Sequence, residues 1–381
     1  MSETKIWDVR DYTTRLEEYP KLPEIVKRWT LMSETKIWDV RDYTTRLEEY
    51  PKLPEIVKTL QDGGLVVLPT ETVYGLGGNA KDDTAIRKIY EAKGRPSDNP
   101  LIVHIHDTDQ LDDFVADISE STRKLMEAFW PGPITFILPL KQGFLCDRVT
   151  GGLNSVAVRM PSHPVALALL KAVDLPIAAP SANLSGRPSP TTFEHAFHDL
   201  NHRVEGIMRS TQSDAGLEST VVDCTSFPFR IARPGTITRN MLNDILPQSV
   251  EVHSPLATEK PIAPGMKYRH YAPSTPLKMI TQLNAPIHED AHEDWSKIAF
   301  IVPETKKKFL PASAQVIVIS ESESDIQGAN HNLYDVLHQL DQLNDVDMAY
   351  IYGFEDNFDT EALRNRMLKA VSQQVVKGES L

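Results

Sequence analysis

The amino-acid sequence predicts an α/β protein in which a large mixed sheet is followed by a smaller unit with a parallel sheet. Helix-like and strand-like segments alternate from residue 53 to residue 246, which is the pattern of an α/β domain. Residues 277–352 then carry four short apolar segments separated by helical stretches, as in βα repeats. The chain has 381 residues, enough for two domains of normal size.

The elements follow from the spacing of the apolar residues. In the segment 82–93, Ile86, Ile89 and Tyr90 recur at helical spacing, whereas 64–68 is an apolar run of strand length. The same patterns predict helices at 53–62, 82–93, 121–130, 163–173 and 236–246. They predict strands at 64–68, 101–105, 134–140, 155–160, 176–179, 219–223 and 230–233, then at 277–280, 298–302, 315–319 and 348–352.

The chain begins with an identical internal repeat, because residues 1–27 recur unchanged as residues 32–58. Structural repeats that stack occur as several diverged units, so residues 1–31 are interpreted as an artefactual duplication. Only the second copy runs directly into an apolar strand, so Met32 is the expected native start. The expected organisation is a duplicated segment 1–31, an α/β domain 32–250, a linker 251–276 and a C-terminal domain 277–381.

Composition limits the function classes. The formal net charge is −13, and residues 276–381 carry 9 Lys and Arg against 17 Asp and Glu. A general nucleic-acid binder needs a basic face, so this balance argues against one. Two cysteines, Cys146 and Cys224, are too few for a disulfide framework or a Cys-rich zinc site. The chain shows neither a membrane-length apolar run nor a signal-peptide pattern, so we expect a cytoplasmic protein without membrane attachment.

The standard nucleotide-binding signatures, the P-loop and the Gly-x-Gly-x-x-Gly loop, are absent from the sequence. A formal match to the zinc-protease motif His-Glu-x-x-His occurs at 288–292. That motif needs a stable helix, whereas Pro286 and an acidic, solvated run surround it here. We therefore expect no zinc protease.

The segment 93–100, Lys-Gly-Arg-Pro-Ser-Asp-Asn-Pro, carries two cations where a helical pattern ends. Lys93 and Arg95 could serve only the helix dipole, which is worth about 0.3 to 1 kcal/mol. However, the two prolines restrict the loop and Asn99 can present its amide, a combination that suits a bound polyanion. Phosphate binding is the favoured interpretation.

Further polar segments follow apolar strands, where α/β proteins place ligands. Each of them alone also fits a solvated turn or a surface arginine. On the predicted strand at 155–159, Ser155 and Arg159 share one face. The other segments are Pro-Thr-Glu-Thr-Val-Tyr-Gly-Leu-Gly-Gly at 69–78, Pro-Ser-Ala-Asn-Leu-Ser-Gly-Arg-Pro-Ser-Pro at 180–190, Gly-Leu-Glu-Ser-Thr at 216–220, Ala-Arg-Pro-Gly at 232–235 and Pro-Gly-Met-Lys-Tyr-Arg-His-Tyr-Ala-Pro at 264–273.

Taken together and in this order, these motifs resemble those of the threonylcarbamoyl-AMP synthase family in its two-domain form, from Met32 onward. The resemblance implies a YrdC-like fold, which is a twisted mixed sheet around a large cleft, and a smaller Rossmann-like C-terminal domain. It also implies a nucleotidyltransferase that converts L-threonine, bicarbonate and ATP, with Mg²⁺, into threonylcarbamoyl-adenylate and pyrophosphate. The product would pass to the machinery that makes N6-threonylcarbamoyladenosine in tRNA, with weak or no direct tRNA binding by this chain.

The resemblance also assigns site residues, with Lys93 and Arg95 as the catalytic cations. The expected ATP-binding residues are Lys93, Arg95, Asn99, Ser155, Ser181, Asn183, Ser189, Arg233 and Tyr271. The expected L-threonine-binding residues are Thr72, His104, Arg159 and Ser219. The metal ligands are unknown, and the linker segment 264–273 is expected to close over ATP as a lid.

Two other functions fit parts of the pattern. An RNA-binding module with a YrdC-like cleft would bind RNA without turning over ATP, and the acidic composition weighs against it. The carbamoyl-adenylate chemistry of hydrogenase maturation requires a Cys-rich zinc module that two cysteines cannot supply.

Overall fold

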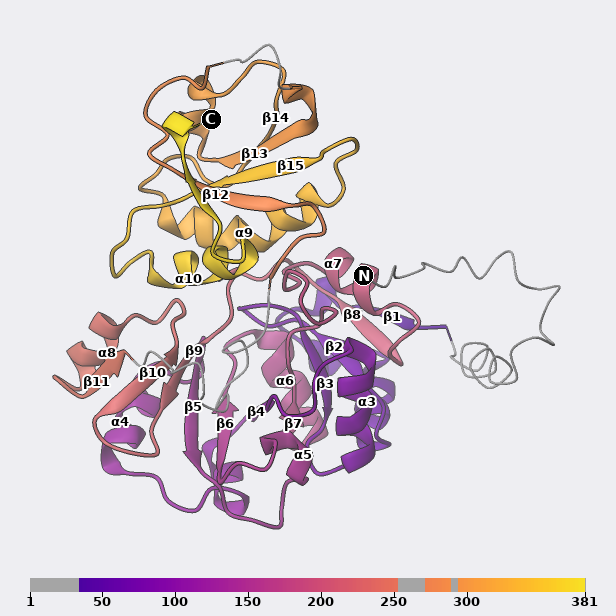
Figure 1. Ribbon diagram of the computed structural model, residues 1–381. Helices are drawn as coiled ribbons and strands as arrows, with labels where there is room; N and C mark the ends of the chain where they lie inside the picture. The colour runs from indigo at the N-terminus through magenta and orange to yellow at the C-terminus, as the bar shows by residue number, and fades with distance from the viewer. Residues whose placement is uncertain (1–33, 253–270, 289–293, 381) are drawn as a thin grey trace, which may run out of the picture.

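The computed structural model describes residues 34–252, 271–288 and 294–380 (Figure 1). The expectations for residues 1–31, for most of the linker and for residues 289–292 of the His-Glu-x-x-His match lie outside the described residues. We call residues 34–252 the N-terminal unit and residues 271–380 the C-terminal unit. The expected domain boundaries stay a prediction.

The N-terminal unit is built on one mixed sheet of eleven strands, as the alternating pattern predicted. Their order in the sheet is β1-β8-β2-β3-β7-β4-β6-β5-β9-β10-β11. The strands are β1 (Lys36–Asp39), β2 (Val66–Leu68), β3 (Gly75–Asn79), β4 (Ile102–His104), β5 (Ile134–Pro139), β6 (Ser155–Arg159), β7 (Ile177–Ala178), β8 (Gly206–Arg209), β9 (Thr220–Asp223), β10 (Phe229–Arg233) and β11 (Val250–Val252).

Helices cover this sheet and bury its apolar side chains. Leu60 of α2 and Leu169 of α6 join Trp38 of β1 in one cluster, whereas Ile89 of α3 and Phe136 of β5 belong to a larger one. The helices are α2 (Leu53–Gln61), α3 (Asp83–Lys93), α4 (Glu120–Phe129), α5 (Asp147–Thr150), α6 (Pro164–Val173), α7 (Phe193–Leu200) and α8 (Arg239–Ile245).

Residues 75–78, part of the polar segment 69–78 for which no strand was predicted, form most of a strand. They belong to β3, which pairs antiparallel with both β2 and β7. A Cβ atom on Gly77 would lie 2.8 Å from Leu68 Cδ2, so the neighbouring strand leaves no room for a side chain there. Glycine weakens an isolated strand, which is why the pattern indicated a turn, but close packing requires it here.

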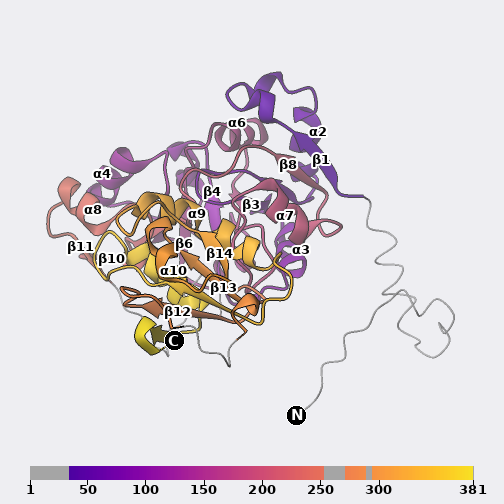
Figure 2. The same cartoon turned by 90° about the horizontal axis from the view of Figure 1, so that it is seen from above.

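The C-terminal unit is a five-stranded parallel sheet with the order β14-β13-β15-β12-β16. Its strands are β12 (Leu277–Thr281), β13 (Ile298–Val302), β14 (Gln315–Val318), β15 (Met348–Tyr352) and β16 (Val375–Lys377), and its helices are α9 (Ile326–Leu340) and α10 (Glu361–Ala370). Figures 1 and 2 show α9 and α10 between the smaller sheet and the N-terminal unit, which they cover from above. Val73, Leu217 and Tyr271 share one apolar cluster with these helices, so the two units are packed together.

Both cysteines are free thiols, Cys146 half-buried and Cys224 buried. Within the described ranges, helices fall short of the length and apolar character needed to cross a membrane.

Candidate active site

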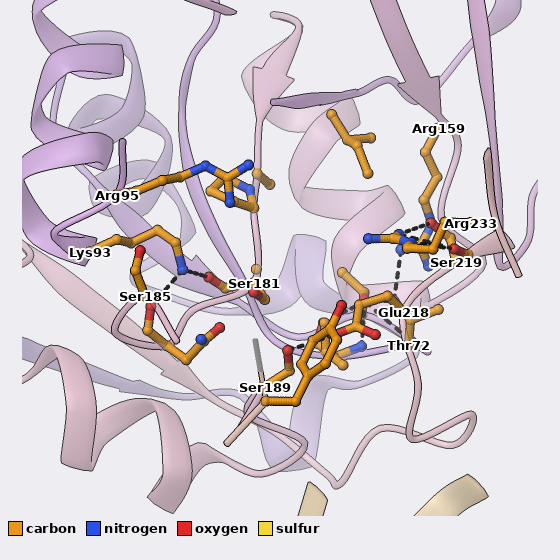
Figure 3. Close-up of a pocket in the computed structure, with 18 of the residues that line it drawn as sticks. Thr72, Lys93, Arg95, Arg159, Ser181, Ser185, Ser189, Glu218, Ser219 and Arg233 are labelled. Atoms are coloured by element: carbon orange, nitrogen blue, oxygen red, sulfur yellow. Dashed lines mark hydrogen bonds between the residues drawn. The ribbon is translucent and has the colours of Figure 1, made fainter. Parts of the chain in front are cut away.

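A cleft opens in the N-terminal unit where the ends of several strands meet the loops that follow them. Figure 3 shows Lys93 and Arg95 on one side of it and Arg159, Arg233 and Ser219 on the other. The cleft is lined by eleven of the thirteen site residues expected from the sequence, namely Thr72, Lys93, Arg95, His104, Arg159, Ser181, Asn183, Ser189, Ser219, Arg233 and Tyr271.

On one side of the cleft, two residues face it from adjacent strands. His104 ends β4 and Arg159 ends β6, and the two are partners in the register of this parallel pair. Arg159 is 4% exposed, donates from Nη1 to Thr72 Oγ1 at 2.7 Å and forms an ion pair with Glu71 at 2.6 Å. Burial alone would raise the pKa of Glu71, but the Arg159 guanidinium outweighs it and lowers that pKa. A charged carboxylate therefore fixes Arg159 from behind.

The imidazole of His104 is neutral in this environment. Burial, together with the neighbouring charge of Arg159, lowers the pKa of His104 to about 3. Its Nδ1 lies 3.3 Å from the carbonyl oxygen of Ile102, which accepts a hydrogen bond when Nδ1 carries the proton. In that tautomer Nε2 is an acceptor for a ligand group.

On the other side, α3 positions the two cations of the Lys-Gly-Arg motif. Asp82 caps the start of the helix by accepting from the Thr84 backbone N–H, and Gly94 ends it in the left-handed conformation at φ 60°. Lys93 is the last helical residue, and its Nζ donates to the backbone carbonyls of Ser181 and Asn183. Burial lowers the pKa of Lys93 well below its ordinary value, so an anion beside it would stabilise its charged form.

Arg95 follows two residues later and remains partly exposed. Its Nη2 donates to the carbonyl oxygen of Pro100 at 3.0 Å, which folds the 93–100 loop back on itself. The helix end and this loop therefore present two cations to one cleft, as the motif predicted.

The loop 180–190 returns beside these cations. Asn183 is 5% exposed and its Nδ2 donates to the carbonyls of Leu184 and Arg187, while its Oδ1 lacks a hydrogen-bond partner. A buried amide oxygen without a partner is costly unless a ligand supplies a donor. Ser181 and Ser189, from the same loop, also line the cleft.

Ser219 and Arg233 lie near Arg159, on the side of the cleft opposite Lys93 and Arg95 (Figure 3). Arg233 is the last residue of β10 and donates from Nη2 to the Ser219 carbonyl at 3.0 Å and to its Oγ at 3.1 Å. The Ser219 hydroxyl also lies 2.8 Å from the Thr135 hydroxyl. Tyr271 is the first described residue of the C-terminal unit. It is buried, and its φ of 66° places it in the left-handed conformation.

Two expected residues do not line the cleft. Asn99 is buried, with its Oδ1 unpartnered, and its carbonyl accepts from the Tyr90 hydroxyl at 3.0 Å. Ser155 begins β6, so it lies at the opposite end of the strand from Arg159. A four-residue separation along a strand amounts to about 13 Å, which explains why a shared face did not bring the two together.

Sequence reasoning missed the carboxylates of the site. Glu218 lines the cleft, and Glu71 supports Arg159 from outside it. Both stand inside motifs that the sequence analysis had singled out, 69–78 and 216–220. An acidic residue within a motif of hydroxyl and glycine residues is the signal that could have revealed them.

The chain matches two family models and is similar to several known proteins. Residues 58–235 match the Sua5/YciO/YrdC family model, described as "Telomere recombination", and residues 237–372 match the model described as "Threonylcarbamoyl-AMP synthase, C-terminal domain". The threonylcarbamoyl-AMP synthase of Bacillus subtilis is 43% identical over 322 residues, which cover 84% of this chain and 92% of that protein. The synthase of Pyrococcus abyssi is 38% identical over 326 residues, which cover 84% and 93%.

Among solved structures, Pyrococcus abyssi Sua5 complexed with L-threonine superposes with a TM-score of 0.78 at 35% identity. The match covers 90% of this chain and 99% of that chain. The chain therefore belongs to the threonylcarbamoyl-AMP synthase family, whose members are enzymes of the nucleotidyltransferase type.

Proposed function

We propose that this enzyme forms threonylcarbamoyl-adenylate and pyrophosphate from L-threonine, bicarbonate and ATP. The observation that carries the proposal is one cleft with Arg159 and a neutral His104 on one side and Lys93 and Arg95 on the other. Pyrococcus abyssi Sua5, a relative of the same fold, has been crystallised in complex with L-threonine. The adenylate then goes, in the cytoplasm, to the transferase machinery that modifies tRNA, with weak or no tRNA binding by this chain.

L-threonine is proposed to bind at the Arg159 side. A guanidinium grips a carboxylate through two parallel hydrogen bonds, and Glu71 and Thr72 already fix the orientation of this one. Neutral His104 and the Ser219 hydroxyl supply polar contacts for the rest of the amino acid. The substrate amine is thereby oriented toward bicarbonate.

ATP is proposed to bind with its phosphates at Lys93 and Arg95 and to extend across the cleft to Arg233. In this proposal Lys93 and Arg95 contact the phosphates. The unpartnered Asn183 Oδ1 accepts a hydrogen bond from the nucleotide. The other proposed ATP-binding residues that line the cleft are Ser181, Ser189, Arg233 and Tyr271. Asn99 and Ser155 do not line it, so the nucleotide would have to extend beyond the cleft to reach them.

The chemistry follows from this placement. The threonine amine attacks the carbon of bicarbonate and water is released, which gives a carbamate. A carbamate oxygen attacks the α-phosphorus of ATP, the bond from that phosphorus to the β-phosphate oxygen breaks, and pyrophosphate leaves with the electron pair. Lys93, Arg95 and Arg233 stabilise the negative charge that develops, so the reaction needs positioning and charge neutralisation but no covalent nucleophile.

The residues present do not form a resident magnesium site. Among the described residues, groups of three His, Cys, Asp or Glu side chains able to hold a metal ion are absent. Glu218, the carboxylate that lines the cleft, is already engaged by Ser189, Tyr334 and Arg366. We therefore propose that Mg²⁺ arrives with the phosphates of ATP.

The proposal is tested by pyrophosphate release from the full chain. Release should require L-threonine and bicarbonate together, and Lys93→Ala should lower it by about a hundredfold or more, because one preorganised charge contact is lost. Lys88→Ala is the matched control, since Lys88 lies on the same helix but contacts Gly63 and Glu205. Release without threonine, or RNA binding without any turnover, would contradict the proposal, and the latter would favour an RNA-binding module.

A further inference from the structure

A buried carboxylate joins the two units beside the cleft. Glu218 is 6% exposed, and its carboxylate accepts from the Ser189 hydroxyl at 2.6 Å on the cleft side. From the C-terminal unit, the Tyr334 hydroxyl lies 2.8 Å from Oε2 and Arg366 Nε lies 3.0 Å from the same oxygen. Tyr334 and Arg366 are completely buried on α9 and α10. Three donors from two units therefore converge on one carboxylate.

The charge balance of this cluster depends on Arg366. Burial would raise the pKa of Glu218, but the positive charges of Arg366 and Arg233 outweigh it and hold that pKa at about 2. A buried charge that loses its partner is strongly destabilising, so Glu218 without Arg366 would draw on another cation. The other cation whose charge acts on Glu218 is Arg233, one of the proposed ATP-binding residues.

Arg366 also holds the backbone on which Arg233 stands. Its Nη1 donates to the carbonyl oxygen of Pro234 at 2.6 Å, while its Nε holds Glu218. Pro234 follows Arg233 in the chain, and Glu218 precedes Ser219, to which Arg233 donates. One guanidinium therefore fixes both backbone segments that meet at the Arg233–Ser219 contact.

The same two side chains flank Tyr271. The rings of Tyr271 and Tyr334 are 5.4 Å apart, and the Arg366 guanidinium carbon lies 6.0 Å from the centre of the Tyr271 ring. Tyr271 lines the cleft, whereas Tyr334 and Arg366 are not among the residues that line it. Any effect of these two residues on a ligand must therefore pass through Glu218, Pro234 or Tyr271.

We propose that Arg366 and Tyr334 are positioning residues by which the C-terminal unit completes the nucleotide side of the cleft. They fix the Glu218 carboxylate that holds the Ser189 hydroxyl, and they keep Arg233 directed at Ser219. The inference rests on the proposed function, because it takes this side of the cleft to be the ATP subsite. On the threonine side, Arg159 and Thr72 lie outside the network, and Ser219 is the one proposed threonine contact that Arg233 touches.

The test measures ATP affinity by calorimetry, and the KM values for ATP and L-threonine, on the full chain. Tyr334→Phe removes one hydroxyl, and Arg366→Lys keeps the charge but cannot hold Glu218 and Pro234 together. Both should weaken ATP binding, by about threefold and about tenfold or more respectively, and should change the KM for L-threonine by a smaller factor, because Arg159 and Thr72 lie outside the network. Tyr352→Phe and Arg364→Lys, changes of the same kind elsewhere in the C-terminal unit, should leave both substrates unaffected.

The outcomes separate the two proposals. If wild-type turnover depends on threonine but Tyr334→Phe and Arg366→Lys bind ATP as wild type does, the positioning role is wrong and the proposed function stands. Parallel losses for ATP and threonine, together with a lower melting temperature, would show a merely structural role. If Arg366→Lys does not fold, Tyr334→Phe decides, because it deletes a single oxygen. A wild-type chain that binds ATP without forming the adenylate would contradict the proposed function, and the ATP affinities of the variants would still test the inference.

Discussion

At the scale of single residues, Arg159 shows how a charge can be buried and still be available to a substrate. Its ion pair with Glu71 and its hydrogen bond to Thr72 leave the guanidinium oriented but at the cleft surface. An ammonium group is a point charge that cannot hold Glu71 and grip a carboxylate in one plane. The identity of this residue, and not only its charge, should therefore matter.

We predict that Arg159→Lys raises the KM for L-threonine by about tenfold or more, a loss of about 1.4 kcal/mol of binding. The KM for ATP should change by less than about twofold, because Lys93 and Arg95 lie on the other side of the cleft. Steady-state pyrophosphate release at varied threonine measures both. Arg209→Lys, at a partly exposed arginine paired with Glu194, is the control. An unchanged threonine dependence would remove Arg159 from the substrate.

Which residues could be predicted from sequence depends on where their partners lie. Lys93 and Arg95 stand in one rigid local motif, so their shared direction follows from a few adjacent residues. Glu218 has partners 116 and 148 residues further along the chain, and local spacing carries no information about such contacts. Ser155 is the opposite case, because a correct strand face did not reveal at which end of the strand the cleft lies.

At the scale of elements, α3 depends on the glycine that follows its last residue to direct Lys93 and Arg95 toward the cleft. Gly94 adopts φ 60°, and a Cβ atom there would meet no other atom within 4 Å. Replacing Gly94 should therefore lower the free energy of unfolding only through backbone conformation, by about 1 to 2 kcal/mol for a residue that avoids the left-handed region. Asparagine tolerates this conformation much better than a β-branched residue.

We therefore predict that Gly94→Val lowers the rate of adenylate formation by at least about tenfold and the free energy of unfolding by about 1 to 2 kcal/mol. Gly94→Asn should retain most of both. Both variants place a side chain into the same open space, so their difference isolates the backbone term. Pyrophosphate release and denaturant titration provide the two readouts, and equal behaviour of the two variants would show that the helix end does not set the direction of Lys93 and Arg95.

Local sequence patterns fail to predict strands for the same reason that they fail to predict site residues, because the deciding contacts are distant in the sequence. β4 and β6 were predictable because they are apolar runs of strand length, whereas β3 contains three glycines in five residues and was not. The reason that β3 is a strand lies in β2 and β7 on either side of it. Tertiary packing overrides propensity at this position.

At the scale of the whole molecule, the two units pack so closely that a side chain at Gly216 would not fit between them. A Cβ atom on Gly216 would lie 2.4 Å from the His331 Cα atom, so α9 packs directly on the backbone of the segment that carries Glu218 and Ser219. The His331 Nδ1 also lies 2.8 Å from the Asp214 carbonyl oxygen. The glycine of the 216–220 motif is thus required for docking of the C-terminal unit, and the motif couples that docking to the cleft.

A histidine pair lies in the same interface and makes it sensitive to acid. The rings of His195 on α7 and His338 on α9 stack at 3.9 Å, and His338 Nε2 lies 3.3 Å from the Ser189 carbonyl oxygen. Burial, with His195 as the next cause, lowers the pKa of His338 to about 3. The charged groups around the pair are Asp335, which lies 3.3 Å from His195, and Asp199 and Arg187, which influence His338 from further away.

This placement fixes the sign of a pH dependence. Between an ordinary histidine pKa of about 6.5 and the lowered value, the unfolded chain binds a proton at this position and the folded chain does not. Stability is therefore complete above about pH 6.5 and falls as the pH drops, by up to about 1.4 kcal/mol per pH unit for each such group. His104 and His163, whose pKa values are also lowered by burial, add to the same slope.

The free energy of unfolding of the wild type should fall as the pH drops from about 6.5 to about 5. We predict that this fall is smaller in His338→Gln, by at most about 1.4 kcal/mol per pH unit, which is the contribution of one titrating group. Glutamine can still donate to the Ser189 carbonyl but cannot bind a proton, so the substitution removes the titration and preserves the contact. The window lies above the usual range of carboxyl pKa values, and any carboxyl contribution, such as that of Glu361, whose pKa is raised by burial, is common to the wild type and the variant. Denaturant titrations at several pH values give the slope, with His198→Gln, at an exposed imidazole, as the control. A slope in His338→Gln equal to that of the wild type would show that the contact between the two units does not hold His338 neutral.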